Sequence, residues 1–458
     1  MSERPPGLER NNGDLLNCEE TTAEPRGDTP KPDMYKRAEF SDLAWPTRSR
    51  SLPSAVKSRL LRPALFSVCL ALLGGAAVSA QTGEIWQEGA ASTRWENGAW
   101  LRTLSGAIKA GGAQQVLRME VSGMLALRPG RPGDTEARYT LETRSSYQDR
   151  ERADKQLAAI EILTESSEDA LSIGLSGAIR QLPASRLTIT VPPRFKTIRV
   201  RQLGGSVDAY SLSAKLYTQI FAGEGRFVDI QNGLVVFSGG GKIVAHRVRG
   251  DVEISSGGGS AEIQDVRGAV RCELGGGDIY VRDVTGSVDV STGGGNVIVE
   301  RAASSVIANT QAGLLEVKNS SGPVVARNRE GILRVFSSGN VKAYAPTGPI
   351  QVLGAYGYLS LSSGGGNIYV ELSPKGLSEN SRITTEGGSI TILLPQRLRL
   401  TVEAESGCAC GKSVISEFPV FGGMDEYSPT VSTIPINGGG TLLRAATQQG
   451  RIVVKKVH

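Results

Sequence analysis

Apolar side chains recur every 18 residues through the middle of the chain, in rows that lie two residues apart. The first pair of rows is Ile243, Ala261, Ile279, Val297, Leu315, Leu333 and Ala245, Ile263, Val281, Val299, Val317, Val335. The second pair is Val252, Val270, Val288, Val306, Val324 and Ile254, Cys272, Val290, Ala308, Ala326. Alternate residues of a strand point to one face. Each repeat therefore predicts two short strands whose aliphatic side chains face a shared interior.

Glycines mark the turns between these strands. Three consecutive glycines start at positions 239, 257, 275 and 293, and single glycines keep the same period at 250, 268 and 286. Glycine supplies the positive φ angles that tight turns need, and an internal repeat near this length is typical of a solenoid. The pattern predicts an all-β, single-chain parallel β-solenoid (a β-helix) with about 18 residues per coil, whose equivalent positions stack roughly 4.8 Å apart.

The repeat shifts further along the chain. The run Gly-Gly-Gly-Asn-Ile-Tyr-Val at 364–370 echoes 275–281 at an offset of 89, one residue short of five periods. We therefore expect a deletion or an altered turn between them. Residues 405–440 break the pattern, and we expect a loop excursion or part of an end cap there, because the bare end of a stack invites aggregation.

The region before the repeat predicts strands and turns without a strict period. We expect residues 81–185 to form a small, irregular β-rich cap and residues 186–458 to form the solenoid. Glu96-Asn97-Gly98 predicts a hairpin turn, 151–160 predicts a helix, and 160–163, 170–175 and 187–191 predict strands. We expect Trp86, Trp95 and Trp100 to form a small hydrophobic core, with a sugar-stacking platform as the alternative.

An export signal is predicted at residues 57–80. Lys57, Arg59 and Arg62 precede an apolar run over 64–73, and small residues lead to a cleavage site after Ala80. An uncleaved anchor is the alternative. Residues 1–56 are polar and proline-rich, which predicts a disordered leader or a start codon assigned too early. The predicted location is the periplasm, the cell envelope or the cell surface.

Charge and cysteine content limit the chemistry. A net charge of +5 over 458 residues gives no electrostatic reason to expect nucleic acid. The two histidines, His246 and His458, argue against a histidine-based catalytic centre. Cys272 falls in an inward row and is predicted to be a buried thiol. Cys408 and Cys410 are most simply two small residues near a turn, with a strained disulfide or a metal-ligand pair as alternatives.

Charged side chains form rows of their own, which support the register. One outward row is Arg247, Asp265, Asp283, Arg301, and another is Arg282, Glu300, Lys318. Asp265 and Asp283 are the only stacked acid pair that we find, and a polysaccharide lyase or hydrolase would need clustered acids of this kind. Calcium-binding repeats place aspartate every nine residues. The corresponding slots here hold Ser260, Asp278 and Asn296, so no metal site is predicted.

The chain resembles a bacterial family known as putative adhesins, which are related in style to head GIN adhesin domains. The resemblance rests on the leader, on 151–175 and 187–192, and above all on the Gly-Gly-Gly-x-Ile-x-Val and Val-x-Gly-x-Val units across 239–299. It covers roughly residues 150–458. It implies an envelope-associated, adhesive role, and it carries over no catalytic residue because the shared motif is structural.

We therefore expect an exported cell-envelope binding or structural protein without a catalytic, cofactor-binding or metal site. Long repetitive faces suit glycans or envelope proteins as partners, and neither nucleic acid nor a small-molecule cofactor is expected. A polysaccharide-active β-helix enzyme is one alternative. The other is an envelope scaffold that polymerises by end-to-end self-association, since an open stack permits it.

Overall fold

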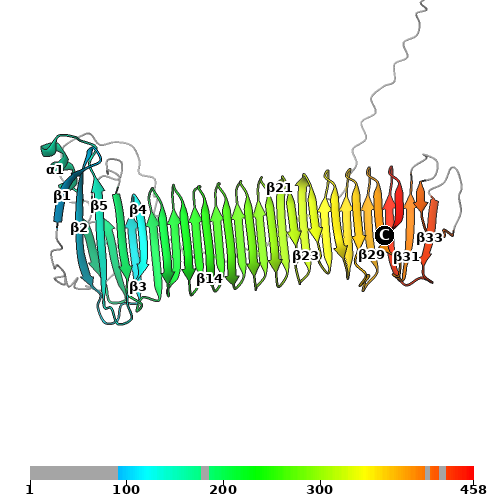
Figure 1. The fold of residues 1–458 in the computed structure, drawn as a ribbon, viewed down its shortest axis with the longest axis horizontal. Coiled ribbons are helices and arrows are strands. Elements are labelled where there is room, and N and C mark those ends of the chain that lie inside the picture. The colour runs from blue at the N-terminus through cyan, green and yellow to red at the C-terminus, as the bar shows by residue number, and fades with distance from the viewer. Residues whose placement is uncertain (1–90, 177–184, 408–412, 422–429, 458) are drawn as a thin grey trace, which may run out of the picture. The chain divides into compact units, whose positions relative to one another are not determined.

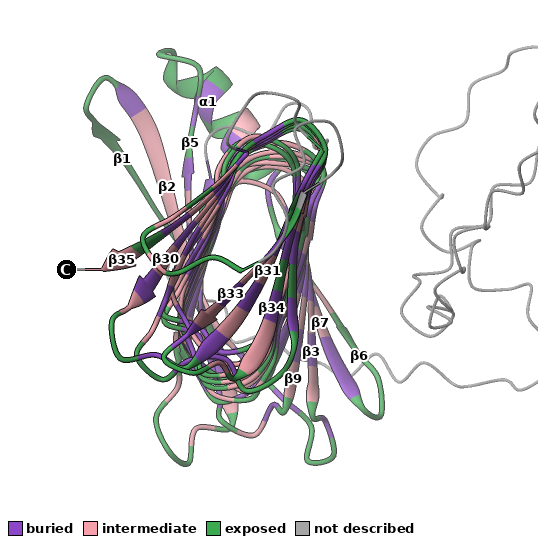
Figure 2. Ribbon diagram, turned by 90° about the vertical axis from the view of Figure 1, so that its right-hand side faces the viewer, coloured by how far each residue is buried: buried purple, intermediate pink, exposed green. Residues whose placement is uncertain are grey.

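The computed structural model describes residues 91–176, 185–407, 413–421 and 430–457. These residues form a parallel β-solenoid of about 11 turns with about 18 residues per turn, which confirms the predicted fold (Figure 1). Figure 2 looks along the stack and shows two sheets, here called sheet A and sheet B, that enclose the interior. Among the described residues no helix is long and apolar enough to cross a membrane.

Each regular coil contributes one strand to each sheet. Sheet A contains β10 (Val207–Leu212), β12 (Gly225–Ile230), β14 (Ile243–Arg249), β16 (Ala261–Arg267), β18 (Ile279–Val284), β20 (Val297–Ala302), β22 (Leu315–Lys318), β24 (Leu333–Phe336), β26 (Ile350–Ala355), β28 (Ile368–Leu372) and β30 (Ile390–Pro395). Sheet B contains β9 (Thr197–Gln202), β11 (Lys215–Ile220), β13 (Leu234–Ser238), β15 (Val252–Ser256), β17 (Val270–Leu274), β19 (Val288–Thr292), β21 (Val306–Ala312), β23 (Val324–Glu330), β25 (Val341–Ala345), β27 (Leu359–Ser363) and β29 (Ser381–Thr385).

The apolar rows stack as the sequence predicts. Val299 pairs with Val281 on one side and with Val317 on the other, and all three side chains are 0% exposed. Burying one such side chain contributes roughly 1.5–3 kcal/mol. Cys272 is buried in its row, and burial raises the pKa of its thiol to about 12. The core is thus one continuous column of aliphatic side chains between the sheets.

A buried polar row holds the glycine turns from inside. The Oγ1 of Thr292 donates to the carbonyl of Gly277 at 2.9 Å, and the Oγ1 of Thr310 donates to that of Gly295 at 3.0 Å. Gly277 has φ +104°, and a Cβ there would overlap the carbonyl oxygen of Gly259 in the preceding coil. Only glycine allows the coils to approach this closely.

The opposite end of the sheet A strands carries a repeated break in pairing, here called the bulge, at which both partner strands skip one residue. Pairing runs from His246–Gln264 to Val248–Val266 and leaves out the residue between them. That residue has a left-handed backbone with φ between 48° and 62° in eight coils. The row is Ser211, Asp229, Arg247, Asp265, Asp283, Arg301, Asn319 and Ser337. The left-handed backbone turns one side chain per coil along this edge of the sheet.

The predicted shift in the repeat is confirmed. Val335 pairs with Val352, and Val324 pairs with Val341, so these coils are one residue short. The missing residue falls in the turn between β24 and β25, at 337–340. The next departure is an insertion, because Val370 pairs with Ile392, a spacing of 22. The four extra residues lie in the turn at 373–380, between β28 and β29.

The N-terminal end is built from strands that do not stack in chain order. β3 (Val116–Val121) and β4 (Met124–Pro129) form a coil directly on β9 and β10, although they come from the segment expected to form the cap. β7 (Ala170–Leu175) and β8 (Ser185–Val191) stack outside that coil. β6 (Ile162–Ser166) pairs antiparallel with β7, and β5 (Glu136–Arg144) pairs antiparallel with β8.

A hairpin and a short helix complete this end. β1 (Ala91–Glu96) and β2 (Ala99–Lys109) join through the predicted turn, and α1 (Arg150–Ala158) confirms the predicted helix. The expected tryptophan core is wrong for the two tryptophans that the structure describes. Trp95 is 48% exposed, because every residue of the edge strand β1 is exposed, and Trp100 on β2 is half-buried. Trp86 lies outside the described residues.

The C-terminal end also breaks chain order. β34 (Thr441–Thr447) lies between β29 and β31 (Leu400–Ser406), and β35 (Ile452–Val457) lies between β30 and β32 (Val414–Ser416). β33 (Thr430–Ile436) then pairs antiparallel with β31. The segment expected to be a loop or part of an end cap is thus part of a cap. Cys408 and Cys410 lie outside the described residues.

Candidate polymer-binding face

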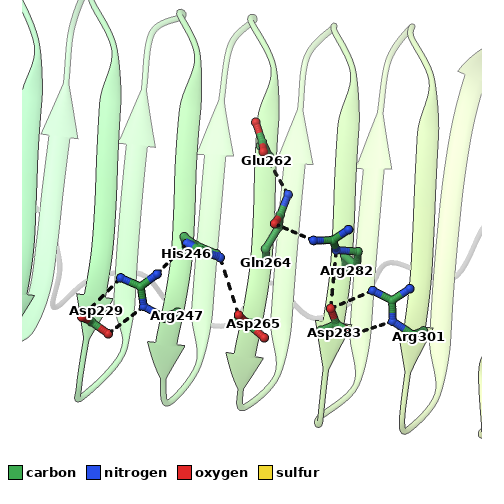
Figure 3. A network of polar contacts seen from close by, with 9 residues as sticks. All are labelled: Asp229, His246, Arg247, Glu262, Gln264, Asp265, Arg282, Asp283 and Arg301. Carbon is green, nitrogen blue, oxygen red and sulfur yellow. Dashed lines mark hydrogen bonds and ion pairs between the residues drawn. The ribbon is translucent and has the colours of Figure 1, made fainter.

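The charged row on the sheet A bulges is a ladder of ion pairs (Figure 3). Arg301 binds Asp283 through two hydrogen bonds of 2.6 and 2.9 Å. Arg247 binds Asp229 of the preceding coil in the same way, and the remaining Asp265 lies 3.6 Å from the Nε2 of His246. The predicted register is confirmed, and the ladder extends one coil further than the sequence row.

Arginine side chains keep two acids of this ladder in the charged form. The hydrogen bond from Arg301 lowers the pKa of Asp283, and the hydrogen bond from Arg247 lowers the pKa of Asp229. A general acid needs a raised pKa so that it carries a proton near neutral pH. Asp229 and Asp283 are therefore the anionic halves of ion pairs with Arg247 and Arg301.

The second charged row connects the same coils. Arg282 donates to the Oε1 of Gln264 at 3.2 Å, and Lys318 lies 2.5 Å from Glu316 and 4.0 Å from Glu300. Arg282, Glu300 and Lys318 occupy paired positions on successive strands, as predicted. Each exposed pair adds only some tenths of a kcal/mol, so the row reports register more than stability.

The slots compared with calcium-binding repeats serve the backbone. The Oδ1 of Asp278 accepts a hydrogen bond of 2.7 Å from the amide of Asn296 in the next coil, and the Oδ1 of Asn296 accepts one of 3.0 Å from the amide of Leu314. Within the described ranges no group of three histidine, cysteine or acidic side chains is placed to hold a metal ion.

A groove that was not predicted from the sequence lies on the outer side of sheet B. It has a volume of about 570 Å³ and crosses five coils, from β17 to β25. Its outer wall is a row of paired positions, one from each strand. They are Glu273, Ser291, Asn309, Arg327 and Tyr344. The tyrosine side is open to solvent, because Tyr344 is 50% exposed.

The groove lies where the triglycine turn disappears. Gly293 is the first residue of the last of these four triglycine turns. In the next three coils the equivalent position holds Gln311, Arg329 and Pro346, and all three line the groove. A Cβ at Gly293 would overlap the carbonyl oxygen of Gly275, so a side chain requires a different turn backbone. The strands change accordingly: β19 has five residues, whereas β21 and β23 have seven.

The floor of the groove is formed by Leu274 and by the buried polar row. The polar members are Thr292, Thr310 and Asn328. Asn328 uses its Nδ2 to hold the carbonyls of Gly313 and Ile332, both at 2.9 Å, and its buried Oδ1 has no hydrogen-bond partner within the described part of the chain. The floor is therefore rigid, since it is tied to the turns of its own and neighbouring coils.

Polar side chains lie side by side on two coils of this groove. Asn309 and Gln311 are two residues apart on β21, and Arg327 and Arg329 take the same places on β23. The sequence carried a signal for Gln311 and Arg329, namely long polar side chains in the slots that hold glycine in earlier coils. That signal was missed because only the conserved spacing of the glycines was followed.

Comparisons with known proteins add names for similar structures. No family model and no curated protein matches the chain. A putative cell adhesion protein from Clostridium sporogenes is similar at 9% identity and a TM-score of 0.19, over 78% of this chain and 100% of that one. A putative adhesin from Bacteroides fragilis is similar at 13% identity and a TM-score of 0.17, over 78% of this chain and 97% of that one. At such scores the function has to be argued from the geometry of this chain.

Proposed function

We propose that this chain is an exported, non-catalytic binding protein of the cell envelope that holds an extended polysaccharide in the sheet B groove. The observation that carries the proposal is the outer wall, in which five successive coils each present one side chain to the same groove. Neighbouring coils are spaced by roughly 4.8 Å, so a chain of repeated units meets a repeated set of contacts. A compact ligand would use only a fraction of such a groove.

The side chains of the groove suit sugars. The exposed ring of Tyr344 offers an apolar face on which a sugar ring can stack, and its hydroxyl remains polar. Asn309 and Gln311 each supply both donors and an acceptor for hydroxyl groups. The groove needs no rearrangement of its floor, because the hydrogen bonds of Asn328 already fix it.

The two alternative functions have less support. The enzyme needs an acid that carries a proton, and the lowered pKa of Asp283 opposes that role.

The scaffold needs sheet edges that accept another copy. On sheet A the C-terminal edge is β32, with three residues, and on sheet B it is the antiparallel β33, which contains Pro435. Short strands and proline are devices that block edge pairing.

Export belongs to this proposal as a prediction, because residues 57–80 lie outside the described residues. Cell fractionation of a tagged chain tests it. Recovery outside the cytoplasm, with the N-terminus of the mature chain at Gln81, supports cleavage after Ala80. Recovery of the full-length chain in the cytoplasm contradicts export.

The binding role is tested by Tyr344→Ala. We expect retention on a panel of immobilised polysaccharides to fall by about tenfold, since stacking on an aromatic ring is removed. The matched control is Tyr369→Ala, because Tyr369 occupies an outward row of sheet A, away from the groove. Equal losses in the two variants, or no retention of the wild-type chain on any polysaccharide, would contradict the proposal.

A further inference from the structure

We infer that the sheet B groove selects polysaccharides that carry carboxylate groups, such as uronate chains, and that Arg327 and Arg329 bind those carboxylates. The inference rests on the proposed function and names its ligand class. Both residues line the groove, and both are exposed. Because they lie two positions apart on β23, they point to the same side of the sheet.

These two arginines keep their hydrogen-bond donors available. Several other arginines of the stack are held by acids, for example Arg247 by Asp229, Arg301 by Asp283, and Arg444 by Glu403 at 2.9 Å. Neither Arg327 nor Arg329 makes an ion pair with any described carboxylate. A planar guanidinium binds a carboxylate through two parallel hydrogen bonds, which a point charge cannot reproduce.

The acids Glu273 and Glu330 do not neutralise the positive charge of the two arginines. Glu273 lies in the same row as Arg327 but on β17, three coils away. Three coils correspond to about 14 Å, which exceeds the screening length of about 8 Å at physiological ionic strength. Glu330 follows Arg329 in the chain without pairing with it, and it does not line the groove. The arginine end of the groove is therefore positively charged.

The neighbouring rows favour an acidic sugar chain over an acidic peptide. On one side of the arginines lie the amides of Asn309 and Gln311, and on the other lies the ring of Tyr344. The guanidinium groups can bind the carboxylates of a uronate chain. The amides can bind its hydroxyls, and the tyrosine ring can stack on a sugar ring. A polyglutamate chain offers carboxylates but neither hydroxyls nor a stacking face.

The test compares four ligands with the full chain: polygalacturonate, dextran, dextran sulfate and polyglutamate. The main variant is R327A/R329A. Its matched control, R271A/R382A, removes the same charge from exposed positions of sheet B outside the groove. A third variant, R327K/R329K, keeps the charge but removes the planar fork.

We expect the wild-type chain to bind polygalacturonate about tenfold or more tightly than dextran and polyglutamate, and more tightly than dextran sulfate. R327A/R329A should lose that advantage, R327K/R329K should lose most of it, and R271A/R382A should stay within about twofold of the wild type. Equal affinity for polygalacturonate and dextran overturns the ligand class but leaves the proposed function. Equal losses in R327A/R329A and R271A/R382A, or preferred binding of dextran sulfate or polyglutamate, also overturn it. Failure to bind any polysaccharide overturns the proposed function itself.

Discussion

The close approach of the glycine turns makes a sharp prediction about two adjacent residues. At Gly277 the backbone has φ +104°, and an added Cβ would overlap the carbonyl oxygen of Gly259. At Gly276 the nearest atom to an added Cβ is the carbonyl oxygen of Gly294, at 4.0 Å, and φ is not positive. The two substitutions to alanine add the same methyl group one residue apart.

The expected effects have opposite signs. Forcing alanine into the positive-φ region costs about 1–3 kcal/mol, and relieving the overlap with the preceding coil adds to that cost. G277A should therefore lower the free energy of unfolding by about 3 kcal/mol or more. G276A should leave the free energy unchanged or raise it by about 0.4–1 kcal/mol, because alanine restricts the unfolded chain.

Urea denaturation followed by circular dichroism measures both variants against the wild type. Stacked repeats can unfold in parts, so hydrogen exchange of the coils around Gly259, Gly277 and Gly295 should accompany it. Increased exchange confined to these coils is the expected signature of G277A. Indistinguishable unfolding of G276A and G277A would refute the stacking of turns described above.

Two further predictions concern side chains of the stack. Burial raises the pKa of Cys272 to about 12. A thiol-specific reagent at about pH 8 should therefore leave this thiol unmodified in the folded chain and modify it in urea. Rapid labelling of Cys272 without urea would contradict its burial. Arg301 lowers the pKa of Asp283 in the folded state. The ion pair therefore stabilises the fold fully above the unfolded pKa of about 3.9. This contribution is lost as the pH falls through the lower, folded pKa. Asp283→Asn should therefore reduce the acid-side pH dependence of stability while leaving stability at low pH similar to that of the wild type. A steeper acid-side dependence in this variant would contradict the sign.

The candidate site was predictable only in part. The ladder around Asp265 and Asp283 followed from the period, because equivalent positions of successive coils must stack. The partner of Arg247 did not, since the choice of Asp229 over Asp265 depends on the side-chain directions set by the bulge. The groove was missed because it arises from residues of five coils that are far apart in the chain.

The sequence by itself determined the repeating unit. The alternation of apolar and polar residues predicts which side chains of each strand face inward, and the glycine positions, repeated every 18 residues, predict where the chain turns. Both follow from the sequence because strand geometry and backbone conformation are local properties. The tertiary structure alone decided the order of stacking at the two ends, where β3 with β4 and β34 with β35 lie between coils that come from elsewhere in the chain. Backbone hydrogen bonds between parallel strands are nearly independent of sequence, so any strand of suitable length and inward pattern can pair with an open coil. Which strand does so depends on how the whole end packs.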